Sequence, residues 1–417
     1  MRILLATSRY PWPPRRGDQI RAVQMLDFLH GEHEVTLLTP EPGPGMPPPP
    51  EGVPCRIEHY RAGGGLAAPK GMARAVLKNE PLQNGLFYQA DLGRRLRELA
   101  PRHDLGILQL SRLGIHLKDF GTTPLLVDLI DSLSLNFSLR AAVDKVWLRP
   151  LLKLEARLLA IAERRLAERA AGMVVVCERD RQALLNRFPP DLAAKVAVVR
   201  LAMRERKVET VHHEERLRPP GDTTSPVLVM TGNLGYFVNV DAITWWLREV
   251  WPHLRRQRPD VRVVVAGDRP TAAVRKAVAE AGVRLIESPR DLRSVISQAT
   301  LSLAPMRCGS GVPIKVLEAW AVGVPVVATS WAVAGTSGRQ GHDFVLVGQH
   351  PIEWVRAIQD LLDNPDARQW LIDNGRQRLA SDYSRPVVAR QLLDTIAALP
   401  LPARGGSAVE MPAAVGG

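Results

Sequence analysis

The sequence has little cysteine and lacks any long apolar run. Its three cysteines among 417 residues, Cys55, Cys177 and Cys308, have the spacing of neither a zinc site nor a disulfide framework. No apolar run reaches the roughly 18 residues that a membrane-spanning helix requires. Polar residues follow the opening segment by Thr7, which is typical of a first strand and not of a secretion signal. These absences favour a globular protein of the reducing cytoplasm.

Two further features narrow the function. No Gly-x-Gly-x-x-Gly run follows the first strand, which argues against a dehydrogenase. The net charge is +12, and residues 1–220 hold 34 Lys and Arg against 25 Asp and Glu. This excess favours an anionic partner such as a membrane surface or a phospholipid-like acceptor, although an arginine-rich composition accounts for part of it. Without an aromatic-bearing motif, charge does not predict nucleic-acid binding.

Short apolar runs alternate with amphipathic stretches along most of the chain, as in βαβ units. Asp18 is expected to cap the first helix. The pattern predicts a parallel sheet with helices on its faces, formed twice. The expected strands are residues 2–6, 34–39, 105–110, 124–130, 173–177 and 195–199, then 227–232, 261–267, 283–286, 301–305, 324–328 and 344–347.

The chain is too long for one typical core, so we expect two domains with a ligand-binding cleft between them. Charges crowd together before Pro219-Pro220-Gly221, which is typical of a linker. The predicted division is an N-terminal Rossmann-like domain at 1–203, a linker at 204–225, a C-terminal Rossmann-like domain at 226–384, a last helix at 385–399 and a disordered tail at 400–417.

A long helical pattern covers residues 139–170, and Pro150 is expected to kink or divide it. Apolar residues recur at helical spacing beside a broken face of arginine and lysine. We expect this apolar stripe to face the core. The alternative is a basic amphipathic helix that lies on an anionic membrane. The stripe consists of Trp147, Leu151, Leu154, Leu158 and Ile161.

The stretch from Gly309 to Thr329 carries the strongest site signal. It opens with Gly309-Ser310-Gly311, a run that leaves backbone N–H groups free to approach an anion. Lys315 and Glu318 share one face of the helix that follows, which is expected to stop at Gly323. A helix N-terminus and a cation suit a diphosphate, and a carboxylate can accept from both hydroxyls of a ribose. The alternative is that these charges are solvated and only complement the helix dipole.

A set of motifs occurs in the order found in one family, and the sequence thereby resembles the glycosyltransferases of family 4. These are retaining enzymes of the GT-B fold that use nucleotide sugars. The loop with Gly17 and Arg21 is also similar to the family's glycine loop, and the subtype resembles sugar transferases of bacterial exopolysaccharide clusters. The motifs are Thr231-Gly232, Asn239-Val240-Asp241-Ala242, Ala266-Gly267, the strand to Pro305, Lys315-Val316-Leu317-Glu318-Ala319 and Gly323-Val324-Pro325-Val326-Val327-Ala328-Thr329.

The resemblance implies a donor site between two doubly wound Rossmann-like domains that face each other across a cleft. Glu318 would bind the ribose of the donor nucleotide, and Gly17 would lie against its diphosphate. The backbone of Gly309-Ser310-Gly311 and the side chain of Lys315 would bind the diphosphate, and Lys315 would stabilise it as it leaves. Asp131, at the carboxyl end of a strand, is expected to contact substrate as a catalytic residue, with helix capping as the alternative.

The sequence departs from the family pattern at several positions. Ser310 stands where the family has the first glutamate of a pair, so a carboxylate contact to the donor sugar is in doubt. Asn233 and Val238 occupy the places of an arginine and a lysine that bind the diphosphate. Lys315 is the expected replacement cation, with Arg307 second, and Asn233 is kept as a donor-binding candidate.

Three other features complete the comparison with the family. Asp18 replaces the second glycine of the N-terminal loop. The catalytic-region histidine of many members is not evident; Asp131 is its nearest equivalent, and His116 is a weaker candidate. Asp128-Leu129-Ile130-Asp131 has the wrong spacing for an Asp-x-Asp metal signature. We therefore expect no metal and no other cofactor.

The predicted function is transfer of a sugar, with retention, from a nucleoside-diphosphate sugar to a glycan or lipid-linked acceptor in cell-surface polysaccharide synthesis. Peripheral association with the inner face of the cytoplasmic membrane is compatible with the basic N-terminal half. Two alternatives share the architecture: a sugar-nucleotide 2-epimerase, and a degenerate protein that binds nucleotide sugars without catalysis. Turnover of donor without acceptor favours the first, and binding without transfer favours the second.

Overall fold

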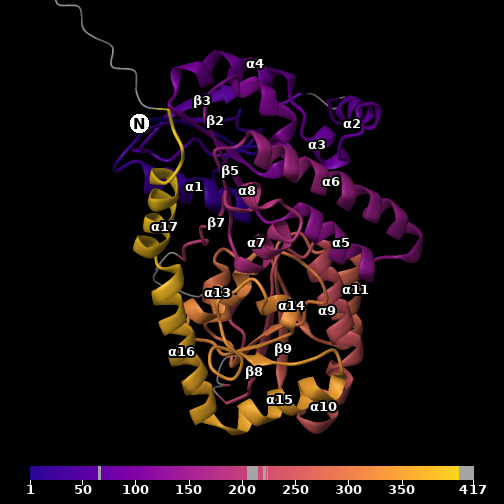
Figure 1. Ribbon diagram of the computed structural model, residues 1–417. Coiled ribbons are helices and arrows are strands. Elements are labelled where there is room, and N and C mark those ends of the chain that lie inside the picture. The colour runs from indigo at the N-terminus through magenta and orange to yellow at the C-terminus, as the bar shows by residue number, and fades with distance from the viewer. Residues whose placement is uncertain (64–66, 204–214, 219–221, 223, 403–417) are drawn as a thin grey trace, which may run out of the picture.

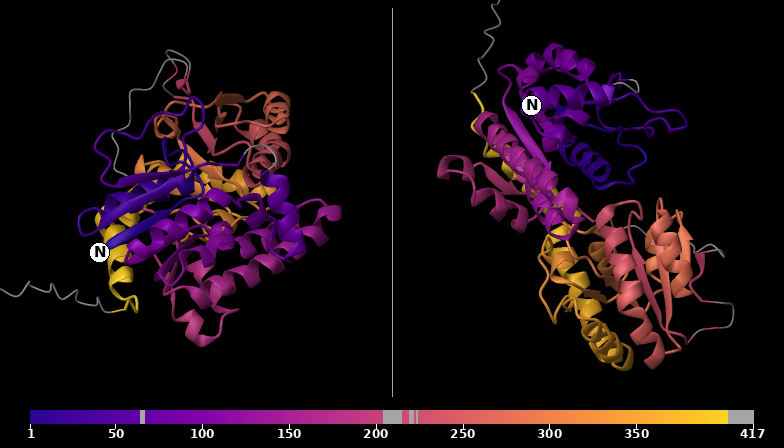
Figure 2. Two further views of the ribbon diagram at one scale, coloured as in Figure 1. Left: turned by 90° about the horizontal axis from the view of Figure 1, so that it is seen from above. Right: turned by 90° about the vertical axis from the view of Figure 1, so that its right-hand side faces the viewer.

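The computed structural model describes residues 1–63, 67–203, 215–218, 222 and 224–402. It has two lobes, one above the other in Figure 1, and a side view shows how narrow their junction is (Figure 2). Most of the expected linker and nearly all of the expected tail lie outside the described residues. Among those described, no helix is long and apolar enough to cross a membrane.

The N-terminal lobe contains a seven-stranded sheet in which neighbouring strands are all parallel. The edge strand β3 was not predicted, because Arg56, Glu58 and His59 interrupt its apolar pattern. The spatial order is β3 (Arg56–Tyr60), β2 (Glu34–Pro40), β1 (Arg2–Ala6), β4 (Leu105–Gln109), β5 (Leu125–Ile130), β6 (Gly172–Val175) and β7 (Val196–Val198).

The C-terminal lobe repeats this design with six parallel strands. The expectation of an α/β protein with two doubly wound sheets is therefore confirmed. The order is β10 (Arg284–Glu287), β9 (Arg262–Gly267), β8 (Val227–Thr231), β11 (Leu301–Ala304), β12 (Val326–Ala328) and β13 (Val345–Leu346).

Helices cover the sheets of both lobes (Figure 1). In the first half they are α1 (Gly17–Leu29), α2 (Ala67–Leu77), α3 (Leu82–Leu86), α4 (Ala90–Leu99), α5 (Leu133–Val143), α6 (Arg149–Arg169), α7 (Glu178–Leu185) and α8 (Pro190–Ala193), with 3-10 turns η1 (Ala100–Arg102), η2 (Ser111–Phe120) and η3 (Val146–Leu148). In the second they are α9 (Phe237–Glu249), α10 (Trp251–Gln257), α11 (Ala272–Ala281), α12 (Leu292–Ile296), α13 (Ile314–Ala321), α14 (Ser330–Val333), α15 (Pro351–Asp363), α16 (Pro365–Tyr383) and α17 (Arg385–Ala397).

The last helix returns to the first lobe. Val388, Leu392 and Ile396 of α17 are buried in the core that β1 and α1 form. An ion pair of 3.2 Å between Arg385 and Asp27 of α1 adds to this contact. Figure 1 shows α16 and α17 running along one side of the molecule and spanning both lobes. The domain boundaries expected from the sequence stay a prediction, and this packing supports a helix that crosses back.

Two expected helix starts are wrong. Arg16 is the N-cap of α1, so Asp18 lies inside the first turn, where it pairs with Arg9 instead of capping. α9 begins at Phe237 and not at Asp241, because Tyr236 supplies the extended residue that precedes the helix. Both errors are shifts of a boundary, and they leave the type of element unchanged.

The long pattern at 139–170 is divided, as expected, but not at Pro150. The break lies at Asp144, the C-cap of α5, and Pro150 occupies the first turn of α6, where its missing N–H has no intrahelical partner to lose. The expected burial is wrong for most of the stripe. The side chains of Trp147, Leu151, Leu154 and Ile161 are exposed, while a different stripe of α6 packs on the lobe.

Candidate active site

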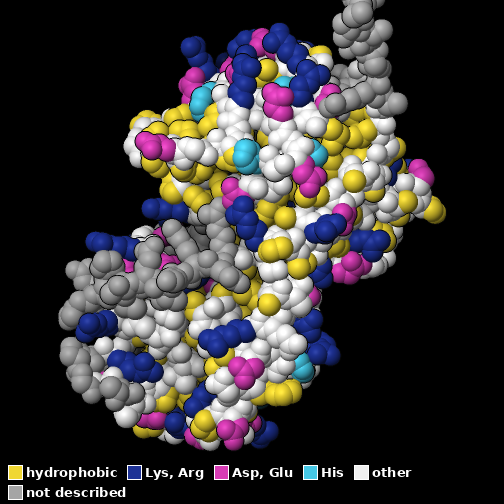
Figure 3. All heavy atoms as spheres, turned by 90° about the vertical axis from the view of Figure 1, so that its left-hand side faces the viewer, with side chains coloured by type: hydrophobic (Ala, Val, Ile, Leu, Met, Phe, Trp, Pro, Cys, Tyr) yellow, Lys and Arg dark blue, Asp and Glu magenta, His cyan; other side chains and the backbone are white. Residues whose placement is uncertain are grey.

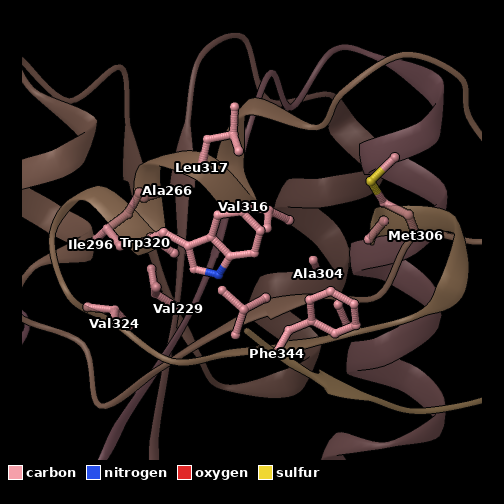
Figure 4. Packing of buried hydrophobic residues seen from close by; sticks show 14 of the residues in the cluster. Val229, Ala266, Ile296, Ala304, Met306, Val316, Leu317, Trp320, Val324 and Phe344 are labelled. Atoms are coloured by element: carbon pink, nitrogen blue, oxygen red, sulfur yellow. The ribbon is translucent and has the colours of Figure 1, made fainter. Parts of the chain in front are cut away.

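α13 is held in place by Trp320 near its C-terminal end. This side chain is buried, packs between β-strand residues such as Val229 and Ala304, and donates to the carbonyl oxygen of Asp343 at 2.9 Å (Figure 4). Gly323 follows the helix with φ of +71°, as predicted for the stop. The anchored C-terminal end of α13 fixes the direction of the rest of the helix, which carries Lys315 in its first turn and Glu318 in the next.

The first turn of α13 lies against the other lobe. A Cβ placed on Gly17, the first residue of α1, would lie 3.8 Å from Cδ1 of Ile314. The fold therefore brings together Gly17 and the α13 helix, which the sequence separates by almost 300 positions. Gly17 and the start of α13 were both predicted to contact the diphosphate of the donor.

Among the described residues, the side chain of Lys315 hydrogen-bonds one group, the side chain of Asn239 in α9. Its Nζ donates to Oδ1 of Asn239 at 2.8 Å, and Nδ2 of Asn239 donates to the carbonyl oxygen of Asn233 at 2.9 Å. Burial lowers the pKa of Lys315 to about 8, with Glu318 acting in the opposite direction. Gly232 makes this arrangement possible, since a Cβ there would lie 2.8 Å from Nδ2 of Asn239.

Glu318 lies one turn further along, half-buried. Among the residues that the structure describes, its carboxylate accepts no hydrogen bond. Burial raises the pKa of Glu318 to about 7, against the attraction of Arg293 and Lys315. A carboxylate in this state is disposed to accept hydrogen bonds from a bound ligand, because such bonds favour its charged form.

Asp131 meets the glycine loop across the junction. Ser310 Oγ donates to Oδ2 of Asp131 at 2.8 Å, and Nδ2 of Asn136 donates to Ser310 Oγ at 2.7 Å. Burial raises the pKa of Asp131, and the hydrogen bond from Ser310 opposes this. Helix capping does not explain Asp131, because Ser132 is the N-cap of α5. Two residues predicted for separate roles are thus in contact.

The glycine loop does not have all its N–H groups free, which corrects the expectation for Gly309–Gly311. Gly311 N donates to Oδ2 of Asp180 at 2.9 Å. Burial, together with the charge of Asp131, raises the pKa of Asp180 to about 6. The sequence did not predict a site role for Asp180, because an acid in the first turn of a helix is ordinarily explained by its favourable interaction with the helix dipole.

A second missed group is the set of arginines around Phe87 in the N-terminal lobe. The guanidinium carbons of Arg9 and Arg112 lie 5.5 and 4.5 Å from the centre of the Phe87 ring. Nε of Arg112 is buried without a hydrogen-bond partner. Burial, and then the charge of Arg9, lower the pKa of Arg112, and Asp131 opposes this. The sequence signal for Arg9 was the arginine-rich loop after β1, and Arg112 of η2 had no local signal.

The remaining candidates have partners of their own. Arg307 forms a two-pronged ion pair with Asp241, with one distance of 2.8 Å. The side chain of Asn233 accepts from Gly235 N at 3.0 Å. Arg21 is fully buried, and its Nε donates to Oδ2 of Asp128 at 3.2 Å. His116 is buried between Asp119 and the backbone N of Gln89. Arg21 and His116 thus have structural roles, and donor binding by Arg307 and Asn233 stays a prediction.

No group of three or more His, Cys, Asp or Glu side chains that could hold a metal ion is found in the part of the chain that the structure describes. The charges of Asp131 and Asp180 interact with each other. Asp131 accepts a hydrogen bond from Ser310, and Asp180 accepts from Gly311 N, Ser132 N and Cys177 Sγ. The available chemistry at the junction is that of a helix N-terminus, one lysine, several arginines and three carboxylates of raised pKa.

Comparison with known proteins gives a family match in the C-terminal lobe. The family Glycosyl transferases group 1 matches residues 225–364. A Klebsiella pneumoniae protein of 44.6 kDa from the cps region is 28% identical over 148 residues, covering 32% of this chain and 38% of that protein. The D-inositol 3-phosphate glycosyltransferase of Salinispora tropica is 33% identical over 159 residues, covering 34% and 32%. The chain thus matches about a third of the length of these curated relatives.

Solved structures match over nearly the whole chain. Sucrose-phosphate synthase from Thermosynechococcus elongatus has a TM-score of 0.69 at 16% identity, covering 95% of this chain and 98% of that one. Anabaena HepE in complex with UDP-glucose has a TM-score of 0.64 at 14% identity, covering 96% and 100%. The chain therefore has the GT-B fold that the sequence predicted, and residues 225–364 match the group 1 glycosyltransferase family, in agreement with the motifs.

Proposed function

We propose that this protein is a retaining glycosyltransferase, which transfers a sugar from a nucleoside-diphosphate sugar to a glycan or lipid-linked acceptor. The observation that carries the proposal is the pair on the first turns of α13. Lys315 and Glu318 are held beside the other lobe with depressed and raised pKa values respectively, and Glu318 has no hydrogen-bond partner among the described residues. Both charges are poised to be stabilised by a ligand.

The donor nucleotide binds with its ribose hydroxyls on Glu318 and its diphosphate at the start of α13. The first N–H groups of the helix and the Lys315 ammonium face the negative charge that develops on the diphosphate as the sugar leaves. Gly17 lies against the same helix end, where the absence of a side chain admits the phosphates. Transfer then requires the acceptor to reach the anomeric carbon from the N-terminal lobe.

Asp131 and the arginines around Phe87 form the acceptor side. Asp131 hydrogen-bonds Ser310 of the opposite lobe, so it lies where donor and acceptor would meet. Its raised pKa suits a group that exchanges a proton with, or accepts a hydrogen bond from, an acceptor hydroxyl. Arg112, with its unpartnered Nε, suits an acceptor that carries phosphate, such as a lipid-linked sugar.

Two relatives support the choice of donor and pathway. HepE was solved with UDP-glucose, which makes a UDP-sugar the first donor to test. The Klebsiella pneumoniae relative comes from the cps region, which agrees with a role in cell-surface polysaccharide synthesis.

The reaction class is tested by NMR of the donor. Glycosyltransferases release sugar slowly to water when no acceptor is present, so UDP-glucose is incubated with the protein and the first-formed anomer of glucose is recorded. We expect α-glucose, the configuration of the donor, at a rate lost in Lys315→Met. A β-anomer would overturn retention. Formation of a UDP-sugar that is epimerised at carbon 2 would identify a sugar-nucleotide 2-epimerase. Binding of UDP-glucose without any turnover, even when lipid-linked acceptors are added, would identify a degenerate protein without catalysis.

A further inference from the structure

The outer face of η3 and α6 is apolar where a core-facing stripe was expected. Val146 and Trp147 are each 72% exposed, and Leu151, Leu154 and Ile161 are 49%, 53% and 47% exposed. Leu151, Leu154 and Ile161 have the spacing of one face of α6, and Val146 and Trp147 of η3 precede them in the chain. We call these five residues the α6 face; it lies at the right-hand edge of the molecule in Figure 1.

The α6 face cannot turn inward, because α6 has a second stripe that already does. Leu152, Leu159 and Leu166 are buried, and so are two acids of the same stripe. Glu155 accepts from the backbone N of Leu82 and of Gln83 at 3.0 and 2.9 Å, which fastens α3 to α6. The helix therefore cannot rotate, and the α6 face stays exposed to water.

Basic residues border the α6 face. Two of the three acids of α6 point away from it, and the third, Glu168, is exposed near the C-terminal end and paired with Arg164 at 3.1 Å. Lys145, Lys153 and Arg157 are exposed, and within the described part of the chain none of the three forms an ion pair. Glu155 and Glu163 are buried on the opposite side of the helix. The result is an apolar stripe next to a row of cations that lacks compensating charge.

The neighbouring helix α2 extends the same pattern. Val76 and Leu77 are 67% and 87% exposed, and Lys70, Arg74 and Lys78 follow one another at intervals of four residues. An ion pair of 2.6 Å between Arg165 and Glu80 joins α6 to the segment that follows α2. On the face along α16 and α17, by contrast, basic and acidic side chains are interspersed (Figure 3).

We propose that the α6 face docks on an anionic lipid bilayer. Apolar side chains enter the boundary between headgroups and acyl chains, Trp147 lies at the interface that tryptophan prefers, and Lys145, Lys153 and Arg157 contact the anionic headgroups. A second copy of this chain fits the face poorly, because it would bring the same cations against one another. The positive charge beside the α6 face therefore favours an anionic membrane over a neutral one.

The α6 face is connected to the candidate active site through rigid elements. α5 begins beside Asp131 and ends next to η3, and its 11 residues span about 16 Å. Glu163 of α6 accepts from Ser134 N at 3.1 Å and so holds the start of α5. A docked α6 face thus keeps the junction within about 16 Å of the lipid surface. This consequence rests on the proposed function, whereas the docking itself does not.

The test is sedimentation of the full chain with vesicles that contain equal amounts of phosphatidylglycerol and phosphatidylcholine. We expect binding to these vesicles and at least tenfold weaker binding to phosphatidylcholine alone. The charge variant Lys153→Glu/Arg157→Glu and the apolar variant Trp147→Ala/Leu154→Ala should each weaken binding at least tenfold. Both alter exposed side chains, so their melting temperatures and UDP-glucose binding should match wild type, which separates failure here from failure of the donor site.

A matched control is Lys276→Glu/Arg356→Glu, which makes the same change of net charge on α11 and α15 of the other lobe. It should bind vesicles as wild type does. Equal loss in this control would reduce the effect to net charge and overturn the proposal. So would absence of binding to anionic vesicles, or a dimer in solution that the Trp147→Ala/Leu154→Ala variant dissociates, since a second copy would then cover the face.

Discussion

Lys315 and Glu318 have pKa values shifted toward each other, to about 8 and about 7. Burial causes both shifts, because it disfavours the charged form of either group. A nucleoside-diphosphate sugar offers two hydroxyls to the carboxylate and two negative phosphates to the ammonium. Each group is therefore most useful in its charged form, and only in a limited pH window are both charged.

We predict a bell-shaped pH dependence of UDP-glucose affinity, with its maximum between about pH 7 and pH 8. Below the window Glu318 takes up a proton and loses acceptor strength; above it Lys315 loses its charge. Calorimetric titration from pH 6 to pH 9 measures this, and UDP-glucose is suitable because its diphosphate does not titrate there. Glu318→Gln should remove the acidic limb and Lys315→Met the basic limb. An unchanged profile in both variants would contradict these assignments.

Asp180 gives a prediction about stability. Its pKa is raised from 3.8 to about 6, so the folded protein holds this proton more tightly than the unfolded chain. Stability from this group therefore falls as pH rises from about 4 to about 6. Asp180→Asn removes the ionisation and keeps an oxygen for the N–H of Gly311, but it loses the acceptor of the N–H of Ser132, which now bonds Oδ1 at 3.2 Å. The stability of the variant relative to wild type should therefore rise between pH 4 and pH 6, by up to about 3 kcal/mol at about 1.4 kcal/mol per pKa unit, on top of a loss for that hydrogen bond that does not depend on pH.

Urea unfolding of wild type and Asp180→Asn at a series of pH values measures this difference. The variant should gain stability relative to wild type from pH 4 to pH 6, and the difference should be constant above pH 6. A difference that does not change between pH 4 and pH 7 would contradict the raised pKa of Asp180.

At the scale of elements, α13 combines a buried half that fixes its position with an end that faces the other lobe. Trp320 is 2% exposed and closes the core between the sheet and α16, and a Cβ on Gly375 of α16 would lie 2.7 Å from its ring. The helix cannot move along its axis without breaking this packing. The positions of Lys315 and Glu318 therefore depend on a residue that touches no ligand.

Trp320→Ala should destabilise the protein by about 3–5 kcal/mol, because it leaves a large cavity in the core. The matched control is Trp147→Ala, which removes the same side chain from a position that is 72% exposed and should change stability by less than about 0.5 kcal/mol. Thermal and urea unfolding compare the two. Similar losses for both tryptophans would mean that η3 is covered in the folded protein.

The sequence predicted these elements well where one physical signal decides them. Short β-branched runs can only be buried parallel strands in this context, and Gly323 marks the end of α13 by the backbone that it alone adopts readily. The direction of a helix with two apolar stripes was not predictable, because periodicity does not say which stripe the fold buries. Leu151 and Leu152 are identical and adjacent in sequence, yet only Leu152 is buried against the lobe.

At the site, residues on one local segment were predicted and contacts between segments were not. Lys315 and Glu318 follow from spacing along one helix. Asp180 and Arg112 are separated from α13 by more than a hundred positions, and nothing local distinguishes them from surface charges. The pairing of Asp131 with Ser310 depends on how the two lobes meet, which no segment of sequence encodes alone.

For the whole molecule, the two lobes are joined across the junction by few polar contacts. Ser310 and Gly311 of one lobe bond Asp131, Asn136 and Asp180 of the other. Because these contacts involve the residues proposed to bind donor and acceptor, substrates and the opposite lobe compete for the same groups. Opening and closing of the lobes is then coupled to occupancy of the site.

We predict that Ser310→Ala/Asn136→Ala shifts the unliganded protein toward a more open arrangement, because two of the contacts are lost. Small-angle X-ray scattering should show a larger radius of gyration than for wild type, and a saturating concentration of UDP-glucose should reduce the difference. Gln257→Ala/Gln359→Ala serves as a control and should scatter as wild type does, because it removes an exposed hydrogen bond of 3.1 Å between α10 and α15, at the end of the C-terminal lobe that is far from the junction (Figure 1). A radius unchanged by the first variant would mean that apolar contacts alone hold the lobes.

The measurement that tests the central claim most directly is calorimetric titration of UDP-glucose, GDP-glucose and ADP-glucose into wild type and Glu318→Gln. Glu249→Gln, which makes the same change at a partly exposed carboxylate at the end of α9, is the control. We predict that one of the three donors binds wild type and the control equally, and that Glu318→Gln weakens it about ten- to a hundredfold, as loss of hydrogen bonds to a charged group does. Binding that Glu318→Gln leaves unchanged, or no binding of any of the three to wild type, would contradict a nucleotide-sugar site at α13.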